Sequence, residues 1–435
     1  MFTRRKALMG ALFGAGAIGL RALATGIPAG MLLKGREAFA ADVAATCANQ
    51  SKAQFIILNT SGNGDPINAN CPGSYADPSI AHNLDATMAA TAMTLAGKAT
   101  TAALPWTTLP QDVLDRMNFW HIMTNTPVHP KEPDVLKLYG ATAPAEMLPS
   151  LLSRQLAPCL GTLQSQPITL GATTPSEGLS YAGQALPIIP PLALKATLTS
   201  PSGPLTNLQK LRDQTLASLD GIYRNKATKA QRAYLDSVVT SQAQARGINQ
   251  DLLSSLSTIK DNTITSQITA AIALIQMKVT PVIVVHIPFG GDNHNDTGLA
   301  TEAAQTVSGV AAIGSLMSQL KAAGLGDQVT FMSLNVFGRT LAPGNVDGRD
   351  HNPNHQVSLT IGKQFKGGVI GGVAKLGTDY GCTSIDASSG SAGGNIAAEE
   401  TLASFGKTAL ASVGVDGSVI ESAITSGSVV NGALA

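Results

Sequence analysis

Residues 281–287 read Pro-Val-Ile-Val-Val-His-Ile, a short and almost wholly apolar run rich in β-branched residues. Such a run is typical of a strand that is buried on both faces of a parallel sheet. The segment Thr301–Ala323 is long enough for a helix, and Gly324 directly after it suits the left-handed conformation that ends many helices. Val329–Leu334 is the next apolar run. Strand, helix and strand at this spacing predict a right-handed crossover unit of a parallel sheet.

Further apolar runs and a different central segment complete the expected organisation. Three more runs predict strands and lie at Phe55–Leu58, Met117–Met123 and Val357–Ile361. Residues 205–275 carry leucines at helical spacing and predict a helical insertion, whereas the proline-rich residues 141–204 predict irregular structure. The sequence therefore predicts a single α/β domain over residues 41–435, with a mostly parallel sheet flanked by helices.

Residues 1–40 have the features of an export signal. Thr3-Arg4-Arg5-Lys6 is a twin-arginine motif, a weakly apolar glycine-rich run follows it, and Ala38-Phe39-Ala40 has the small residues of a cleavage site. The alternative is a membrane anchor, but Arg21 interrupts the apolar run before the roughly 20 residues that a bilayer requires. We therefore expect export by the twin-arginine translocase to the periplasm or the extracellular space, with no stable membrane span.

The charge of the mature chain argues against a nucleic-acid partner. Residues 1–40 contain 6 of the 29 basic residues and 1 of the 28 acidic residues, so their removal leaves 23 against 27 and a net charge of about −4. A surface that binds nucleic acid needs an excess of basic residues.

Four cysteines lie in the mature chain, at Cys47, Cys71, Cys159 and Cys382. An even number of cysteines in an exported protein favours disulfides, and Cys47 with Cys71 is the closest pair along the chain. Ligation of a metal by thiolates is the alternative, but the sequence contains no CxxC spacing. Disulfide pairing is therefore expected.

Two Asp/His pairs beside glycines carry the clearest sign of chemistry. Asp292 and His294 follow the 281–287 run, and Asp350 and His351 lie in a loop that enters the next predicted strand. Carboxylate oxygens and imidazole nitrogens are ordinary ligands of zinc and other divalent metals. Ligands of open α/β sheets bind outside the carboxyl ends of the strands, so the second loop would have to fold back to the same edge. The pattern predicts a site for a divalent metal such as zinc, manganese or calcium.

Other motifs extend or limit this prediction. Asp65 ends the polar loop after the first strand and is a further candidate ligand, although a Gly-Asp-Pro sequence also forms turns. The sequence has no P-loop, dinucleotide fingerprint or Gly-x-Ser-x-Gly elbow, so no nucleotide or organic cofactor is expected.

Four motifs occur in the order and spacing of one protein family, and they are FGGDNH at 289–294, NVFGRT at 335–340, GRDHNP at 348–353 and KGGVIG at 366–371. The chain thereby resembles the DUF1501 family, exported bacterial proteins of unassigned function that are similar in fold to alkaline phosphatases and sulfatases. The resemblance implies an alkaline-phosphatase-like sheet and a two-metal hydrolase of phosphate or sulfate esters.

The same resemblance implies roles for individual residues. Asp292 with His294 would bind one metal, and Asp350 with His351 matches the Asp-His ligand pair of the superfamily. Arg339 would hold an anionic oxygen through its planar guanidinium. The nucleophile would follow the first strand, where Thr60 and Ser61 are the candidates.

The chain also departs from the superfamily pattern. Asn59 stands where the superfamily has an aspartate, Val336 replaces a carboxylate, and Gly291 replaces a tryptophan. These changes leave open a second interpretation, a catalytically degenerate member that binds an envelope glycan or protein, or that is purely structural.

Each candidate residue also has a structural interpretation. Asp292 and His294 could form a turn, and Arg339 could be a buried arginine paired with Asp350 or Asp347. Three other histidines are weaker candidates: His129 is expected in a loop, His286 in the core, and His355 could join a site near His351.

Overall fold

The computed structural model describes residues 49–172, 178–199, 250–344 and 347–435. The predicted signal segment 1–40 and most of the predicted insertion 205–275 therefore lie outside the described residues. Within the described part of the chain, no helix is both long and apolar enough to span a membrane.

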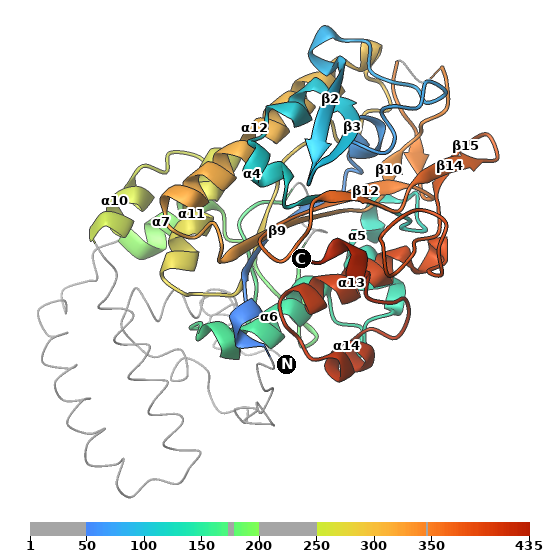
Figure 1. Ribbon diagram of the computed structural model, residues 1–435. Coiled ribbons are helices and arrows are strands. Elements are labelled where there is room, and N and C mark those ends of the chain that lie inside the picture. Colours follow the sequence, from blue (N-terminus) through green and yellow to red (C-terminus); the bar gives the residue numbers. More distant parts are fainter. Residues whose placement is uncertain (1–48, 173–177, 200–249, 345–346) are drawn as a thin grey trace, which may run out of the picture.

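A seven-stranded sheet forms the centre of the fold, in the order β13-β4-β12-β9-β1-β8-β5 (Figure 1). In that order its strands are β13 (Gly368–Ile370), β4 (Met117–Ile122), β12 (Gln356–Ile361), β9 (Val329–Asn335), β1 (Phe55–Ser61), β8 (Val282–Val285) and β5 (Ile168–Thr169). β12 runs antiparallel to both of its neighbours, and the other neighbouring strands are parallel. All five predicted runs are strands of this sheet, which confirms a mixed α/β fold with a mostly parallel sheet.

The reversed direction of β12 decides where its entering loop lies. Gln356 at the start of β12 pairs with Ile122 at the end of β4, and Ile361 at its end pairs with Met117. The amino end of β12 therefore lies at the edge where the parallel strands have their carboxyl ends. The loop that carries Asp350 and His351 reaches this edge without a further fold-back.

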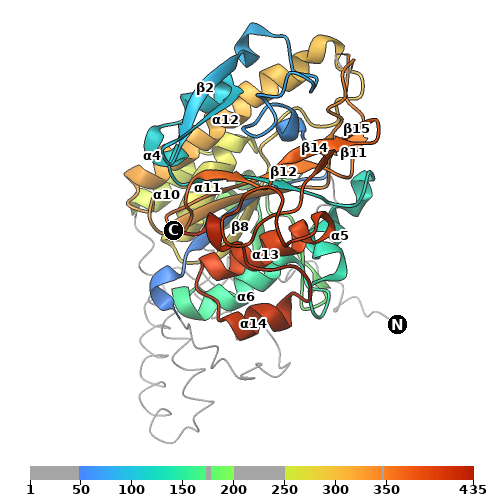
Figure 2. The same cartoon turned by 45° about the vertical axis from the view of Figure 1, so that its right-hand side comes forward.

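Both faces of the sheet are covered, because the central strands are apolar on both sides. Ile57 of β1 packs in a core with α11 (Ile264–Gln276) and α12 (Ala300–Ala322), whereas Ile56 and Leu58 pack in a second core with α6 (Leu148–Leu160) and α13 (Thr401–Ser412). Figures 1 and 2 show these two pairs of helices on opposite sides of the sheet. Burial on both faces explains why the strands read as continuous apolar runs.

The predicted strand-helix-strand unit is present. α12 connects β8 to β9, which flank β1 on either side. Gly324 follows the end of α12 with a φ of +71°, as expected for a residue that ends a helix in the left-handed region. The other α-helices of the described residues are α4 (Gln111–Leu114), α5 (Glu132–Leu136), α7 (Pro191–Thr199), α10 (Gln250–Ser257) and α14 (Gly417–Ala423). The other strands form four two-stranded antiparallel sheets: β2–β3 (Ala90–Leu95, Lys98–Ala103), β6–β7 (Ser180–Tyr181, Gln184–Ala185), β10–β11 (Gly338–Arg339, His351–Asn352) and β14–β15 (Val373–Leu376, Asp379–Cys382).

One prediction about the middle of the chain needs correction. The segment 141–204 is not irregular, since it contains α6, β5 and α7. Pro149 and Pro191 stand in the first turn of their helices, where the missing N–H has no helical partner, whereas Pro158 lies inside α6, two residues before its end. The described end of the predicted insertion is helical, and α11 packs in the core on one face of the sheet.

The expectation of disulfides does not hold for two of the four cysteines. Cys71 and Cys382 are both free thiols, and Cys47 lies outside the described residues. Burial raises the pKa of each of the two free thiols to about 12. Both cysteines therefore act as small apolar core residues.

Candidate metal centre

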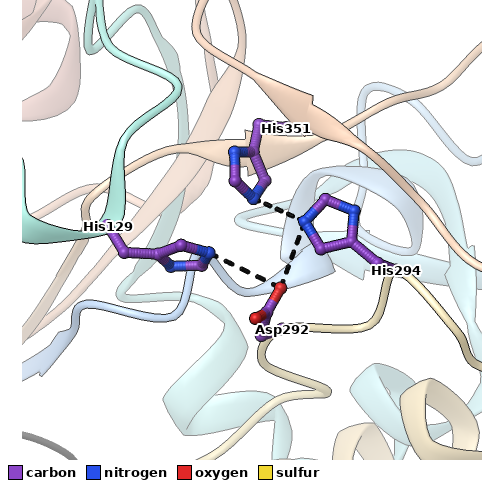
Figure 3. Close-up of side chains that lie close together, drawn as sticks. All are labelled: His129, Asp292, His294 and His351. Atoms are coloured by element: carbon purple, nitrogen blue, oxygen red, sulfur yellow. Dashed lines mark hydrogen bonds and ion pairs between the residues drawn. The ribbon is translucent and has the colours of Figure 1, made fainter.

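Four side chains meet at the carboxyl edge of the sheet (Figure 3). They are His129, in a short 3-10 helix after β4, Asp292 and His294, in the loop after β8, and His351 on β11. One ligand atom of each residue lies within 4.8 Å of the ligand atoms of the other three. The group could hold a metal ion.

In these imidazole rings, the hydrogen-bond partner of Nδ1 determines which ring nitrogen carries the proton. Nδ1 of His351 lies against the carbonyl oxygen of Pro127, and Nδ1 of His129 lies 2.7 Å from the carbonyl oxygen of Gly62. Carbonyl oxygens only accept hydrogen bonds, so each Nδ1 donates its proton and each neutral ring has its lone pair on Nε2.

A carboxylate places the proton of His294 in the same way. Its Nδ1 lies 3.0 Å from Oδ1 of Asp350, which leaves the lone pair on Nε2. Histidines that ligate metals usually donate their other N–H to a carbonyl or carboxylate in this way. In the neutral form, each of the three rings therefore turns the lone pair of Nε2 toward the group.

The separations between these atoms fit one ion. Asp292 Oδ1 lies 3.3 Å from Nε2 of His294 and 3.5 Å from Nε2 of His129. Zinc bonds of about 2.0–2.1 Å at tetrahedral angles would separate neighbouring donors by about 3.3 Å. Nε2 of His294 and Nε2 of His351 lie closer, at 2.7 Å. Two lone pairs at that distance repel each other unless a cation, either a proton or a metal ion, lies against them.

Arg339 fixes the charge of Asp292. Nη2 of Arg339 lies 3.1 Å from Oδ1 of Asp292. Partial burial raises the pKa of Asp292, but the charge and hydrogen bond of Arg339 outweigh it, so the pKa lies below the ordinary value. Asp292 is therefore a carboxylate at neutral pH and can act as a ligand.

All five N–H groups of Arg339 have partners within the protein. Nε donates to Gly64, Nη2 to Asn63 and Asp292, and Nη1 to Arg349 and weakly to Nε2 of His294, at 3.4 Å. The side chain is fully buried. Arg339 is thus a buried arginine that holds the loops around the metal group, and its partner is Asp292 rather than Asp350 or Asp347. No N–H remains for an anionic substrate in this arrangement.

An aromatic ring supports two of the histidines. The ring centroid of Phe337 lies 4.2 Å from that of His351 and 4.9 Å from that of His129. A Cβ atom at Gly64 would collide with the Phe337 ring, and the φ of Gly64 is +70°. Glycine is required there because the loop after β1 approaches the ring closely.

The structure separates two predicted ligands from the group. Asp350 is exposed and lies behind His294, where it orients the imidazole ring. Asp65 is buried, and its Oδ1 accepts a hydrogen bond from the backbone N–H of Gly291. Burial raises the pKa of Asp65. Both carboxylates therefore position ligand loops and do not lie among the four grouped residues.

The candidate nucleophiles lie in the sheet. Thr60 and Ser61 are buried at the end of β1, outside the four-residue group. Asn59 lies beside them, and its amide accepts from the N–H of Ile287 at 2.6 Å and lies 3.4 Å from the carbonyl oxygen of Ile287. An aspartate could only accept, so the asparagine suits a position that links β1 to the end of β8.

His129 is the residue that sequence reasoning placed in an ordinary loop. Its one sequence signal was a position shortly after β4, at the same edge of the sheet as the Asp/His loops. The other two weak candidates, His286 and His355, lie outside the group. His286 is half-buried and contacts the carbonyl oxygen of Thr60, and His355 is buried against His121.

The fold and this group define a mixed α/β protein with a candidate centre for a divalent metal. Residues 204–385 match the model of a family described as "Protein of unknown function (DUF1501)". The matched range includes Asp292, His294 and His351 but not His129. No curated protein matches the chain.

Proposed function

We propose that this protein is an exported metal-dependent hydrolase of phosphate or sulfate esters in the bacterial envelope. The observation that carries the proposal is the convergence of three Nε2 atoms and one carboxylate oxygen, with each Nδ1 held by an oxygen that accepts its hydrogen bond. Without a cation, the lone pairs of neutral rings in this arrangement would repel one another, and a metal ion shared by all four groups removes this repulsion.

The position of the group favours catalysis over a purely structural metal. The side chains of His129, His294 and Asp292 are 31%, 35% and 49% exposed, so water and a substrate can reach the ligand atoms. Four protein ligands alone are typical of a closed structural zinc site, but zinc can expand to five ligands, and the exposed side chains leave room for a water or substrate as the fifth. A divalent ion bound here would polarise an ester oxygen and lower the pKa of a bound water to about 7.

The proposed centre differs from the two-metal site implied by the superfamily. Within the described residues, one group of histidines and carboxylates satisfies the distance requirements of a metal. We therefore propose a single ion, with zinc first because three histidines and one carboxylate suit it, and manganese as the alternative. The ester class and the alkaline-phosphatase-like architecture rest on the sequence motifs, and the envelope location rests on the twin-arginine motif.

A second candidate function is binding without turnover. Its support is that Arg339 has no free N–H and that Thr60 and Ser61 are buried in β1. A protein of this kind would use the metal to hold an anionic envelope glycan or a protein partner.

The first experiment measures metal content and turnover together. The folded mature protein is isolated from the periplasm, its metals are measured by elemental mass spectrometry, and it is assayed with p-nitrophenyl phosphate and p-nitrophenyl sulfate. One zinc or manganese per chain and turnover of either ester that disappears in His294→Ala support the hydrolase. The matched control is His82→Ala, since His82 lies outside the group.

Each other outcome has a distinct meaning. One metal per chain without turnover of either ester supports the binding function. A chain that remains metal-free after incubation with zinc, manganese and calcium contradicts both functions.

A further inference from the structure

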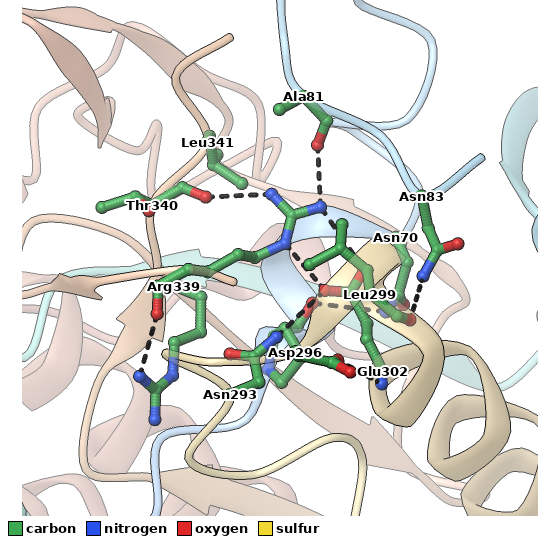
Figure 4. Close-up of polar contacts among 12 residues, drawn as sticks. Asn70, Ala81, Asn83, Asn293, Asp296, Leu299, Glu302, Arg339, Thr340 and Leu341 are labelled. Carbon is green, nitrogen blue, oxygen red and sulfur yellow. Dashed lines mark hydrogen bonds and ion pairs between the residues drawn. The ribbon is translucent and has the colours of Figure 1, made fainter. Parts of the chain in front are cut away.

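A buried ion pair lies behind the metal group. Nε of Arg349 lies 2.7 Å from Oε2 of Glu302, and both side chains are fully buried. Nη1 and Nη2 of Arg349 also donate to the carbonyl oxygens of Thr340 and Ala81, at 3.0 and 2.9 Å. Figure 4 shows these two carbonyls and the Glu302 carboxylate converging from separate segments. The guanidinium therefore ties α12 to two loops.

Glu302 connects this ion pair to the loop of Asp292 and His294. Asn293, which lies between these two ligands, has its Nδ2 3.3 Å from Oε2 of Glu302 (Figure 4). The carboxylate of Asp296 accepts the backbone N–H groups of Thr301 and Glu302, at 2.8 and 2.9 Å. The loop is thereby fixed at both ends to the first turn of α12.

Arg349 connects the same ion pair to the loop of His351. Its backbone N–H donates to the carbonyl oxygen of Asn293 at 3.0 Å, so the two ligand loops are joined directly. A Cβ atom at Gly348 would lie 2.0 Å from the carbonyl oxygen of His294. The two loops therefore pack backbone against backbone, and the ion pair lies immediately behind this contact.

We propose that Arg349 and Glu302 are positioning residues that set the distance between the two ligand loops and thereby the affinity for the metal. This inference rests on the proposed metal centre. Neither residue lies in the ligand group, so the effect acts through Asn293 and Gly348 on His294 and His351. Loss of a hydrogen bond that orients a metal ligand typically weakens metal binding about 10- to 100-fold.

The test compares metal affinity with stability in matched variants. Glu302→Gln keeps the shape of the side chain and removes the charge. The control is Glu146→Gln, because Glu146 is also buried and paired with an arginine, at 2.9 Å from Arg154, and it belongs to the opposite face of the sheet. The zinc dissociation constant of each apoprotein is measured against a chromophoric chelator, with unfolding in urea measured separately. The cobalt(II) absorption spectrum reports the ligand geometry.

The expected result is a zinc dissociation constant about 10- to 100-fold higher for Glu302→Gln, with an altered cobalt spectrum, and an unchanged constant for Glu146→Gln. Should Glu302→Gln fail to fold, Asn293→Ala removes the link to the ligand loop without stranding a buried charge, and the same weakening is expected. An unchanged affinity in the folded variants overturns the positioning role alone. A wild-type protein that binds neither zinc nor cobalt overturns the metal centre itself.

Discussion

Acidification from pH 7 to pH 5 should destabilise the fold through a buried pair of histidines. His121 on β4 donates from Nε2 to the carbonyl oxygen of Pro72, and its Nδ1 accepts from Nε2 of His355 at 2.8 Å. Nδ1 of His355 faces the side-chain amide of Asn68 at 3.4 Å. Every ring nitrogen therefore has a role that suits the neutral form, and an added proton would place two N–H groups against each other.

The magnitude follows from the burial of the pair. Burial lowers the pKa of His121 from 6.5 to about 4, and burial together with the neighbouring His121 lowers the pKa of His355 well below 6.5. Between pH 6.5 and 4 the unfolded chain binds protons that the folded chain does not, so stability falls as the pH falls through this window. The loss is about 1.4 kcal/mol per pH unit, or about 2 kcal/mol from His121 at pH 5, and His355 adds a further loss in the same direction.

Urea unfolding at pH 7 and pH 5 measures this effect, with a chelator present so that metal binding does not contribute. His121→Asn keeps a donor for Pro72 and an acceptor for His355 but does not titrate. Its loss of unfolding free energy between the two pH values should be about 2 kcal/mol smaller than in the wild type. The control Ile57→Val lowers stability by about 1 kcal/mol at both pH values and leaves the difference between them unchanged. An equal loss in His121→Asn and the wild type would refute the reasoning.

Three further predictions concern the metal group and the core. Asp350→Asn should weaken zinc binding about tenfold, because it removes the charge that orients His294. The control Asp327→Asn, a surface change before β9, should leave the zinc dissociation constant unchanged. Arg339→Met should lower the unfolding free energy of the apoprotein in urea by about 3 kcal/mol, since it leaves buried carbonyl oxygens without donors, and a loss below about 1 kcal/mol would contradict this. Cys71 and Cys382 should remain unlabelled by a thiol reagent at pH 8 until urea unfolds the protein, as read by peptide mass spectrometry, because their thiols are buried with pKa values near 12.

The strands could be predicted because burial on both faces leaves a simple sequence pattern. Residues 281–287 and Val329–Leu334 are mostly apolar for this reason. The direction of β12 could not be predicted in the same way, since an apolar run is the same in either direction. The helix at Leu148–Leu160 could not be predicted from its prolines, because proline usually indicates irregular structure, whereas here Pro149 stands in the first turn and Pro158 near the end of the helix.

The candidate site, like the fold, could be predicted only in part. Asp292, His294 and His351 could be singled out because they lie in short polar motifs next to strands. His129 belongs to a different loop, and its role depends on a turn of the chain after β4 that no local pattern records. Asp350 lies behind His294 rather than beside it among the ligands, and this position depends on the direction of side chains, which the sequence does not show.

Arg339 connects the geometry of the site to the choice between ester classes. Its five donors are engaged by the protein, so under the proposed hydrolase function an ester would meet a bound ion, rather than a free guanidinium, as the main positive charge. A phosphate monoester carries about −1.5 to −2 charges at neutral pH and needs more positive charge than one ion partly balanced by Asp292 can supply. A sulfate monoester carries one negative charge and makes a smaller demand. The comparison of p-nitrophenyl sulfate with p-nitrophenyl phosphate therefore tests Arg339 as well as turnover: faster hydrolysis of the sulfate fits a guanidinium that keeps its protein partners. Faster hydrolysis of the phosphate would mean that Arg339 exchanges them for the substrate.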